Sequence, residues 1–192
     1  MNEVSHRRFA FGTASIGIGV TPKTLRNWLD REQVILETER TEGGHYRFSW
    51  SDILVLSVVA ELVRCGVNVK EAYHMTDGVR MHTMMLNRYR NAPLAALEAA
   101  ISYMALYAQP PRMGESRWYY GWHQTGIRSD DFERTQPLFI RLNAAAVFAA
   151  ARARIEEWEE GLDDNEIGPD GQFHGAVMDG APLPVPGDKP TE

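Results

Sequence analysis

The sequence predicts a mainly α-helical protein with a small β component. Three observations indicate this class. Capping residues followed by apolar residues at helical spacing recur along the chain. Short β-branched or aromatic runs between them are typical of strands. The segment after residue 160 is rich in Gly, Pro and Asp and holds few large apolar residues, which is typical of disorder.

The charges are unevenly distributed over the 192 residues. Residues 1–141 hold 17 Lys or Arg and 15 Asp or Glu, whereas residues 142–192 hold 3 and 11. The net charge of −6 therefore comes from the last quarter of the chain, and it does not exclude nucleic-acid binding by the rest. A single cysteine excludes a disulfide framework and any zinc site that needs two thiolates.

No targeting or membrane segment is recognisable in the sequence. No apolar run approaches the roughly 20 residues that a membrane span needs. The first residues lack the apolar stretch and cleavage site of a signal peptide. We therefore expect a cytoplasmic protein.

The first lobe is expected to begin with two helices joined by a glycine turn. A helix over 11–16 leads into the turn at 17–19, and a second helix follows over 22–31. Thr21 can cap the second helix, and Pro22 suits its first position because the N–H that proline lacks would be unbonded there anyway. The inward face of this helix holds Leu25, Trp28 and Leu29.

A β-hairpin is expected next. The β-branched run 34–36 and the run 45–48 are interpreted as its two strands, separated by polar residues 37–42 and the Gly43–Gly44 pair.

Two further helices complete the first lobe. Ser51 is placed as the cap of a helix over 52–64, which Gly66 ends, and Asn68 starts another with Glu71 in the capping-box position. The 52–64 helix is apolar nearly all round. It therefore needs cover from the C-terminal part of the chain or from a second subunit.

The C-terminal module is expected to be a small α+β or helical unit. We predict a helix over 93–107, strands over 116–122 and 138–142, and a helix capped by Asn143 that runs to about Glu160. The aromatic run 116–122 is interpreted as core or subunit interface, with a ligand pocket or a base-stacking platform as alternatives.

Helix, glycine turn, capped helix and hairpin form the layout of a winged helix-turn-helix. In that layout the second helix enters the DNA major groove, and the wing contacts backbone or minor groove. The outward side chains of the second helix suit phosphate contacts and base-edge recognition, and Asn27 could pair with adenine. The candidate DNA-binding residues are Lys23, Thr24, Arg26, Asn27 and Arg31 on the helix, and Arg40, His45, Tyr46 and Arg47 on the hairpin.

Four short motifs resemble the DNA-binding domain of the MerR family. They are VTPKTLRNW at 20–28, TEGGHYRF at 41–48, SDI at 51–53 and CGVNVKEA at 65–72, in the family's order and spacing. The resemblance covers about residues 9–79 and implies a MerR-like winged helix-turn-helix transcription regulator.

The resemblance also implies roles for individual residues. Arg26 corresponds to the arginine that holds a DNA phosphate, Lys23 and Thr24 to groove-facing positions, and Arg47 to the second wing arginine. Tyr46 stands where the family has the first wing arginine, so one backbone contact differs. The C-terminal half has neither the long heptad helix through which typical members dimerise nor the cysteine pair of metal sensors.

Four segments are therefore expected. They are a flexible N-terminus (1–8), a winged helix-turn-helix domain (9–79), an oligomerisation or sensing module (80–160) and a disordered acidic tail (161–192). Cys65, at the last turn of an apolar helix, is expected to be a buried small side chain.

The predicted function is sequence-specific transcription regulation in a bacterium or phage. We expect a homodimer that binds double-stranded DNA, associates with the nucleoid in the cytoplasm and has RNA polymerase as a candidate partner. The alternatives are a DNA-architectural, phage-packaging or recombination factor with the same winged domain, and an interaction adaptor that does not bind DNA. The sequence shows no catalytic motif and no cofactor or metal constellation, so we expect no enzyme, cofactor or metal site.

Overall fold

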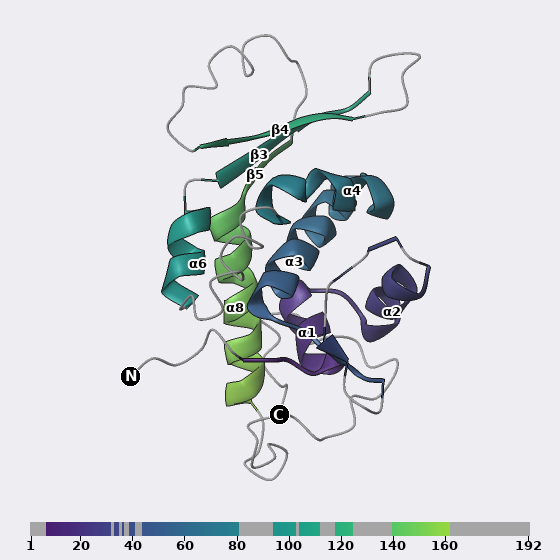
Figure 1. Ribbon diagram of the computed structural model, residues 1–192, viewed down its shortest axis with the longest axis vertical. Helices are drawn as coiled ribbons and strands as arrows, with labels where there is room; N and C mark the ends of the chain where they lie inside the picture. Colours follow the sequence, from purple (N-terminus) through teal and green to yellow (C-terminus); the bar gives the residue numbers. More distant parts are fainter. Residues whose placement is uncertain are drawn as a thin grey trace, which may run out of the picture.

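The protein is mainly helical and has two small antiparallel sheets, as its sequence predicts. The computed structural model describes residues 7–31, 33–34, 36, 39–40, 44–80, 94–102, 104–111, 118–124 and 140–161. Figure 1 shows the three-stranded sheet at one end of the molecule and the long helix α8 running from that sheet along the N-terminal helices. None of the helices in these described ranges is long and apolar enough to span a membrane.

The N-terminal elements follow the expected order. They are α1 (Phe11–Ile18), α2 (Pro22–Asp30), β1 (Glu39–Arg40), β2 (Tyr46–Arg47), α3 (Trp50–Arg64) and α4 (Val69–Met75). The C-terminal elements combine helices with a sheet. They are α6 (Leu94–Ile101), β3 (Met104–Gln109), β4 (Tyr119–Gln124), β5 (Ile140–Asn143) and α8 (Ala144–Glu160).

Three of the predicted helix starts are confirmed by their caps. The side-chain oxygens of Thr21, Asn68 and Asn143 each accept a hydrogen bond from the main-chain N–H three residues further on, at 3.1, 3.0 and 3.2 Å. Each bond satisfies one of the N–H groups that a helix start leaves unpaired. Pro22 occupies the first turn of α2, as expected.

Two helix ends differ from the prediction. Helix α1 continues through Gly17 and Ile18 and ends at Gly19, which has a left-handed φ of 77°. Helix α3 is capped by Ser49 rather than Ser51, because Asp52 completes a capping box with Ser49. The Ser49 N–H donates to Asp52 at 2.7 Å, and the Asp52 N–H donates to the Ser49 hydroxyl at 3.1 Å.

The hairpin is present, but its first strand begins later than expected. Strand β1 lies at 39–40, where Glu39 pairs with Arg47 and Arg40 with Tyr46. The prediction of a strand over 34–36 is wrong, because Val34 lies in a bend and Leu36 lies in no strand. Val34 is instead buried, and its N–H donates to the Trp28 carbonyl at the end of α2.

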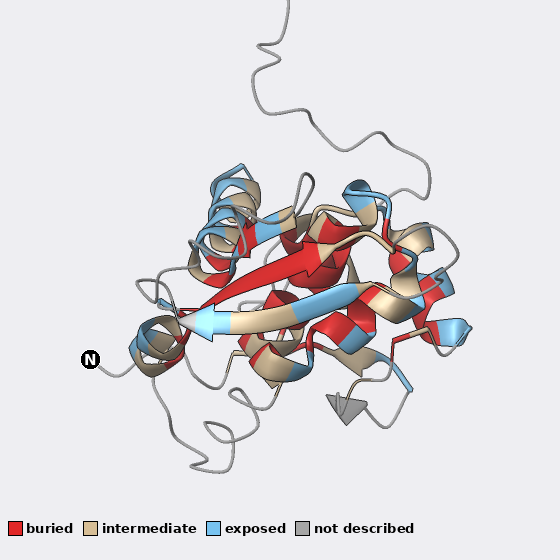
Figure 2. Ribbon diagram, turned by 90° about the horizontal axis from the view of Figure 1, so that it is seen from above, coloured by how far each residue is buried: buried red, intermediate tan, exposed pale blue. Residues whose placement is uncertain are grey.

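The helix expected over 93–107 is wrong in its second half. Helix α6 ends at Ile101, and residues 104–109 form β3, the central strand of the sheet order β4-β3-β5. Figure 2 shows β3 buried beside the more exposed edge strand β4. Pairing on both sides and burial override the helix propensity of the Met, Leu and Ala residues in this run. Strands β4 and β5 overlap the strands expected over 116–122 and 138–142 and end two residues and one residue later, and residues 116–117 and 138–139 lie outside the described residues.

Helix α8 supplies the cover that α3 needs. It packs against α1 and α3 (Figure 1), and its Phe148, Ala151 and Ile155 join the same buried cluster as the apolar residues of α3. One core therefore runs through N-terminal and C-terminal elements. Cys65, expected to be buried, is exposed because it lies beyond the last turn of α3. The expectations for residues 1–6 and for the tail 162–192 lie outside the described residues.

Candidate nucleic-acid interface

Helix α2 separates an apolar face from a polar face. Leu25, Trp28 and Leu29 are buried, as predicted. The polar face follows the i, i+3, i+4 pattern of one side of a helix. Its exposed side chains are Lys23, Arg26, Asn27 and Asp30, and Arg31 follows just after the helix.

Thr24 has a local role at the start of α2. Its hydroxyl lies 2.8 Å from that of Thr21, and its N–H donates to the same Thr21 oxygen. The side chain is half-buried. Thr24 thus contributes to the start of the helix, whereas Lys23 next to it projects to the outside.

Phe11 of α1 connects α2 with the wing. The Arg26 guanidinium carbon lies 5.6 Å from the centroid of the Phe11 ring. The same ring lies 6.4 Å from the Tyr46 ring and 5.8 Å from the Phe48 ring. A cation over an aromatic face is attracted by the ring quadrupole, so this contact restrains the Arg26 side chain while leaving it exposed.

The wing is anchored at its base by Phe48. The Phe9 and Phe48 main chains form an isolated bridge, with N–H···O distances of 2.8 and 3.0 Å. Tyr46 stacks on Phe48 at 6.0 Å. His45 is exposed and Arg47 half-buried, and the Arg40 main chain pairs with Tyr46. The structure therefore places the hairpin candidates on one short ribbon joined to α2 through Phe11.

Two arginines from distant helices hold the end of α1, and sequence reasoning missed both. Arg64 of α3 donates to the Gly19 carbonyl at 2.9 Å. Arg154 of α8 donates to the Gly17 carbonyl through Nε at 2.9 Å and Nη2 at 2.7 Å. Burial, and next the nearby Arg64 charge, lower the pKa of Arg154 below its ordinary value. The only signal in the sequence is that Arg154 falls on the inward side of an alanine-rich helix.

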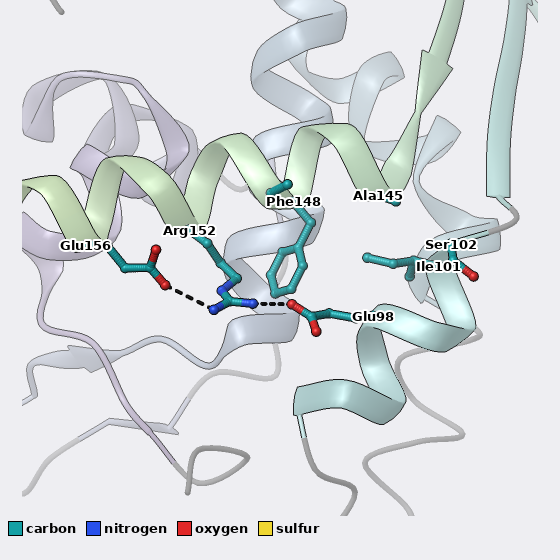
Figure 3. Close-up of a pocket in the computed structure, with 8 residues that line it drawn as sticks. Glu98, Ile101, Ser102, Ala145, Phe148, Arg152 and Glu156 are labelled. Carbon is teal, nitrogen blue, oxygen red and sulfur yellow. Dashed lines mark hydrogen bonds and ion pairs between the residues drawn. The ribbon is translucent and has the colours of Figure 1, made fainter.

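A groove of about 500 Å³ lies between α6 and α8. Figure 3 shows Arg152 between Glu98 and Glu156 on one side of it, with Phe148 reaching toward α6. Burial alone lowers the pKa of Arg152, but its hydrogen bonds to the two carboxylates outweigh this and raise it. The lining residues are Glu98, Ile101, Ser102, Ala145, Phe148, Ala149, Arg152 and Glu156.

The aromatic segment of β4 attaches the sheet to α4. The Trp122 indole N–H donates to the Met75 carbonyl at 2.7 Å, and the Tyr120 hydroxyl donates to the His74 carbonyl at 3.2 Å. These contacts within the chain agree with the core alternative for Trp122, whereas Tyr120 is 41% exposed. Tyr119 remains 49% exposed. Nowhere in the described ranges do three or more His, Cys, Asp or Glu side chains gather in a way that could hold a metal ion.

Two helices joined at a left-handed glycine, an exposed polar face on the second helix and a hairpin wing define a winged helix-turn-helix, a class of DNA-binding domains. The comparison with known families agrees. Residues 11–79, about a third of the chain, match the family described as MerR HTH family regulatory protein. Among curated proteins, none matches the chain. The match indicates DNA-binding transcription regulation and confirms the resemblance seen in the sequence.

Proposed function

We propose that the protein is a sequence-specific transcription regulator that binds double-stranded DNA as a homodimer. The observation that carries the proposal is the exposed face of α2, where Lys23, Arg26 and Asn27 lie together over a fully buried apolar side. A helix with this division can enter the major groove with its polar side while its apolar side stays in the core.

The proposed contacts differ in kind. Arg26 and the wing residue Arg47 neutralise phosphates, which gives affinity for any sequence. Lys23 and Asn27 reach base edges, which gives discrimination. The remaining proposed DNA contacts are made by Thr24 and Arg31 of the helix region and by Arg40, His45 and Tyr46 of the wing.

A homodimer is proposed because one winged domain covers too little DNA for strong specific binding, and paired half-sites supply both affinity and specificity. Since α8 covers α3 within the chain, the edge strand β4 with its exposed Tyr119 is the better candidate for the subunit contact. Light scattering at micromolar concentration tests this proposal. A strict monomer with and without DNA would exclude the dimer.

We further propose the division into a winged domain (9–79), a sensing or oligomerisation module (80–160) and an acidic tail (161–192). The groove between α6 and α8 supports a sensing role, because it combines an apolar floor with charged groups at one side. We propose a cytoplasmic, nucleoid-associated location, and RNA polymerase as a partner.

The decisive experiment is selection of bound fragments from a random DNA pool, followed by binding of the selected site and its point variants. We expect Asn27→Ala to reduce discrimination at one base pair by about 1–3 kcal/mol. Glu157→Ala, which removes an exposed side chain of α8 to which no DNA contact is assigned, is the control. Sites near promoters in cells support regulation, whereas attachment or packaging sites support an architectural role. If no DNA binds at low salt, the proposed function is wrong.

A further inference from the structure

Helix α8 lies directly against the first helix of the DNA-binding domain. The two helices pack against each other, and Gly17 of α1 faces Ile155 and Ala151 of α8 at this contact. A Cβ atom at Gly17 would lie 2.6 Å from Cδ1 and 2.8 Å from Cγ1 of Ile155. Real Cβ atoms essentially never come so close to another heavy atom. A side chain at position 17 therefore requires Ile155 to move, and Ile155 is fully buried in the core.

The two glycines of the turn serve different purposes. Gly19 has the left-handed φ of 77° that lets the chain leave α1 and start α2. Gly17 lies inside α1, where glycine costs about 1 kcal/mol relative to alanine. Its use in the helix is explained by the contact with α8 and not by the turn.

Polar contacts hold the same point. Arg154 places two N–H donors on the Gly17 carbonyl, and Arg64 places one on the Gly19 carbonyl. The Gly17 carbonyl belongs to the penultimate residue of α1, and the Gly19 carbonyl belongs to its C-cap. Both lie at the C-terminal end of the helix, where the helix dipole is negative. Arg154 is half-buried, and the positive charge of Arg64 acts against its own. Its two hydrogen bonds to the Gly17 carbonyl orient the Arg154 guanidinium toward α1.

We propose that α8 positions the DNA-reading helix by locking α1 through Gly17, with Arg154 and Ile155 as the two parts of the lock. In this arrangement the C-terminal half sets DNA affinity without touching DNA. The inference rests on the proposed function and adds a positioning role for residues outside the region matched to the MerR family.

A size exchange between Gly17 and Ile155 tests the apolar part of the lock. Helix propensity alone predicts that Gly17→Ala stabilises α1 and leaves DNA binding intact. The lock predicts the opposite sign: a loss of affinity for the selected site of about fivefold or more, the usual size of coupling between sites. Adding Ile155→Ala should restore part of the loss, because it removes both atoms that the new methyl group meets.

The DNA affinity of each variant is measured by fluorescence anisotropy on the full-length chain. The measurements are made at a temperature at which thermal unfolding shows every variant to be folded. Unchanged binding by Gly17→Ala overturns the proposal. So does a double variant whose loss equals the sum of the two single losses, since independent sites add.

Salt dependence tests the polar part. Arg154→Met should weaken binding without changing the slope of log affinity against log salt, because its donors are on Gly17 and not on phosphate. Arg154→Lys, which keeps the charge and one donor direction, should recover part of the affinity. Arg141→Met, which removes an equal charge from an exposed position of β5, should leave affinity unchanged.

Two results would contradict a positioning role. One is a slope reduced by about one unit in Arg154→Met, which would make Arg154 a phosphate contact. The other is an Arg154→Met variant that binds DNA as tightly as the unaltered protein. Amide hydrogen exchange at Gly19 and Val20, measured without DNA, separates this inference from the proposed function. The lock predicts faster exchange there in Arg154→Met even if no DNA is ever bound, and unchanged exchange overturns the lock alone.

Discussion

Helices α2 and α8 are both exposed on one side, but they carry opposite charge. The outer face of α2 presents Lys23 and Arg26, whereas the end of α8 presents acidic residues that include Glu156 and Glu157. Glu159 in the same turn pairs with Arg7 near the N-terminus. Because DNA attracts positive charge and repels negative charge, this pattern favours approaches in which α2, and not the end of α8, faces the duplex.

The two helices also differ in how they relate to the core. Helix α2 contacts the rest of the protein through three buried side chains on one face. Helix α8 buries Phe148, Ala151 and Ile155 along its length and contacts both α1 and α3. Helix α2 is therefore suited to contacting DNA, and helix α8 is suited to positioning the elements that carry α2. The predictions below test this division.

The largest effect is expected in the core contact of α8. Phe148 is 1% exposed and packs edge-on against Trp50, with ring centroids 5.6 Å apart. Phe148→Ala should lower the free energy of unfolding by about 3–5 kcal/mol. Chemical denaturation followed by tryptophan fluorescence and by far-UV circular dichroism should still give one coincident transition, because N-terminal and C-terminal elements share the core. Two separate transitions would show that the halves unfold independently.

The next largest effect concerns the α2 face itself. Arg26→Ala should weaken binding to every DNA sequence by about 1.5–3 kcal/mol, the usual value of a hydrogen bond to a charged group. It should also reduce the salt slope by about one unit. Glu157→Gln on α8 removes an exposed charge of the other sign, and we expect it to leave the slope unchanged. If Arg26→Ala binds as tightly as the unaltered protein, α2 does not dock as proposed.

The sequence determines the N-terminal half, which contains the region matched to the MerR family, much better than the other half. Capped starts such as Thr21–Pro22 and Asn68 are local signals, since the cap and its N–H partner are three residues apart. The candidate site was predicted from the exposed positions of a single amphipathic helix, and the structure does expose Lys23, Arg26 and Asn27.

Features that depend on distant partners were not predictable. Residues 104–107 have the composition of a helix and form a strand only because β4 and β5 pair on either side. The contact of Arg154 with Gly17 joins residues 137 positions apart, and no local pattern indicates it. Val34, next to the wing, was assigned to a strand because its burial against the end of α2 cannot be seen in a short β-branched run.

A smaller effect distinguishes Ser49, the cap of α3 in the structure, from Ser51, the cap predicted from the sequence. Ser49→Ala should destabilise the protein by about 0.5–2 kcal/mol, because it removes the cap of α3. Ser51→Ala, the matched control two residues further on, should change stability by less than about 0.5 kcal/mol. Thermal unfolding of both variants measures the difference. A larger loss in Ser51→Ala would favour the cap expected from the sequence.

The smallest effect concerns the charge that follows α8. Residues 161–192 hold seven acidic residues and one lysine, and α8 ends where this segment begins. A polyanion tethered to a DNA-binding domain competes with phosphate for the same cations at a high effective concentration. A chain that ends at Glu160 should therefore bind nonspecific DNA more tightly at low salt, by less than about tenfold. The advantage should disappear near physiological salt, where charges are screened over about 8 Å. Anisotropy titrations of both chains across a salt series measure this. Equal affinities at low ionic strength would show that the segment only adds net charge, and loss of folding on truncation would show that it belongs to the fold.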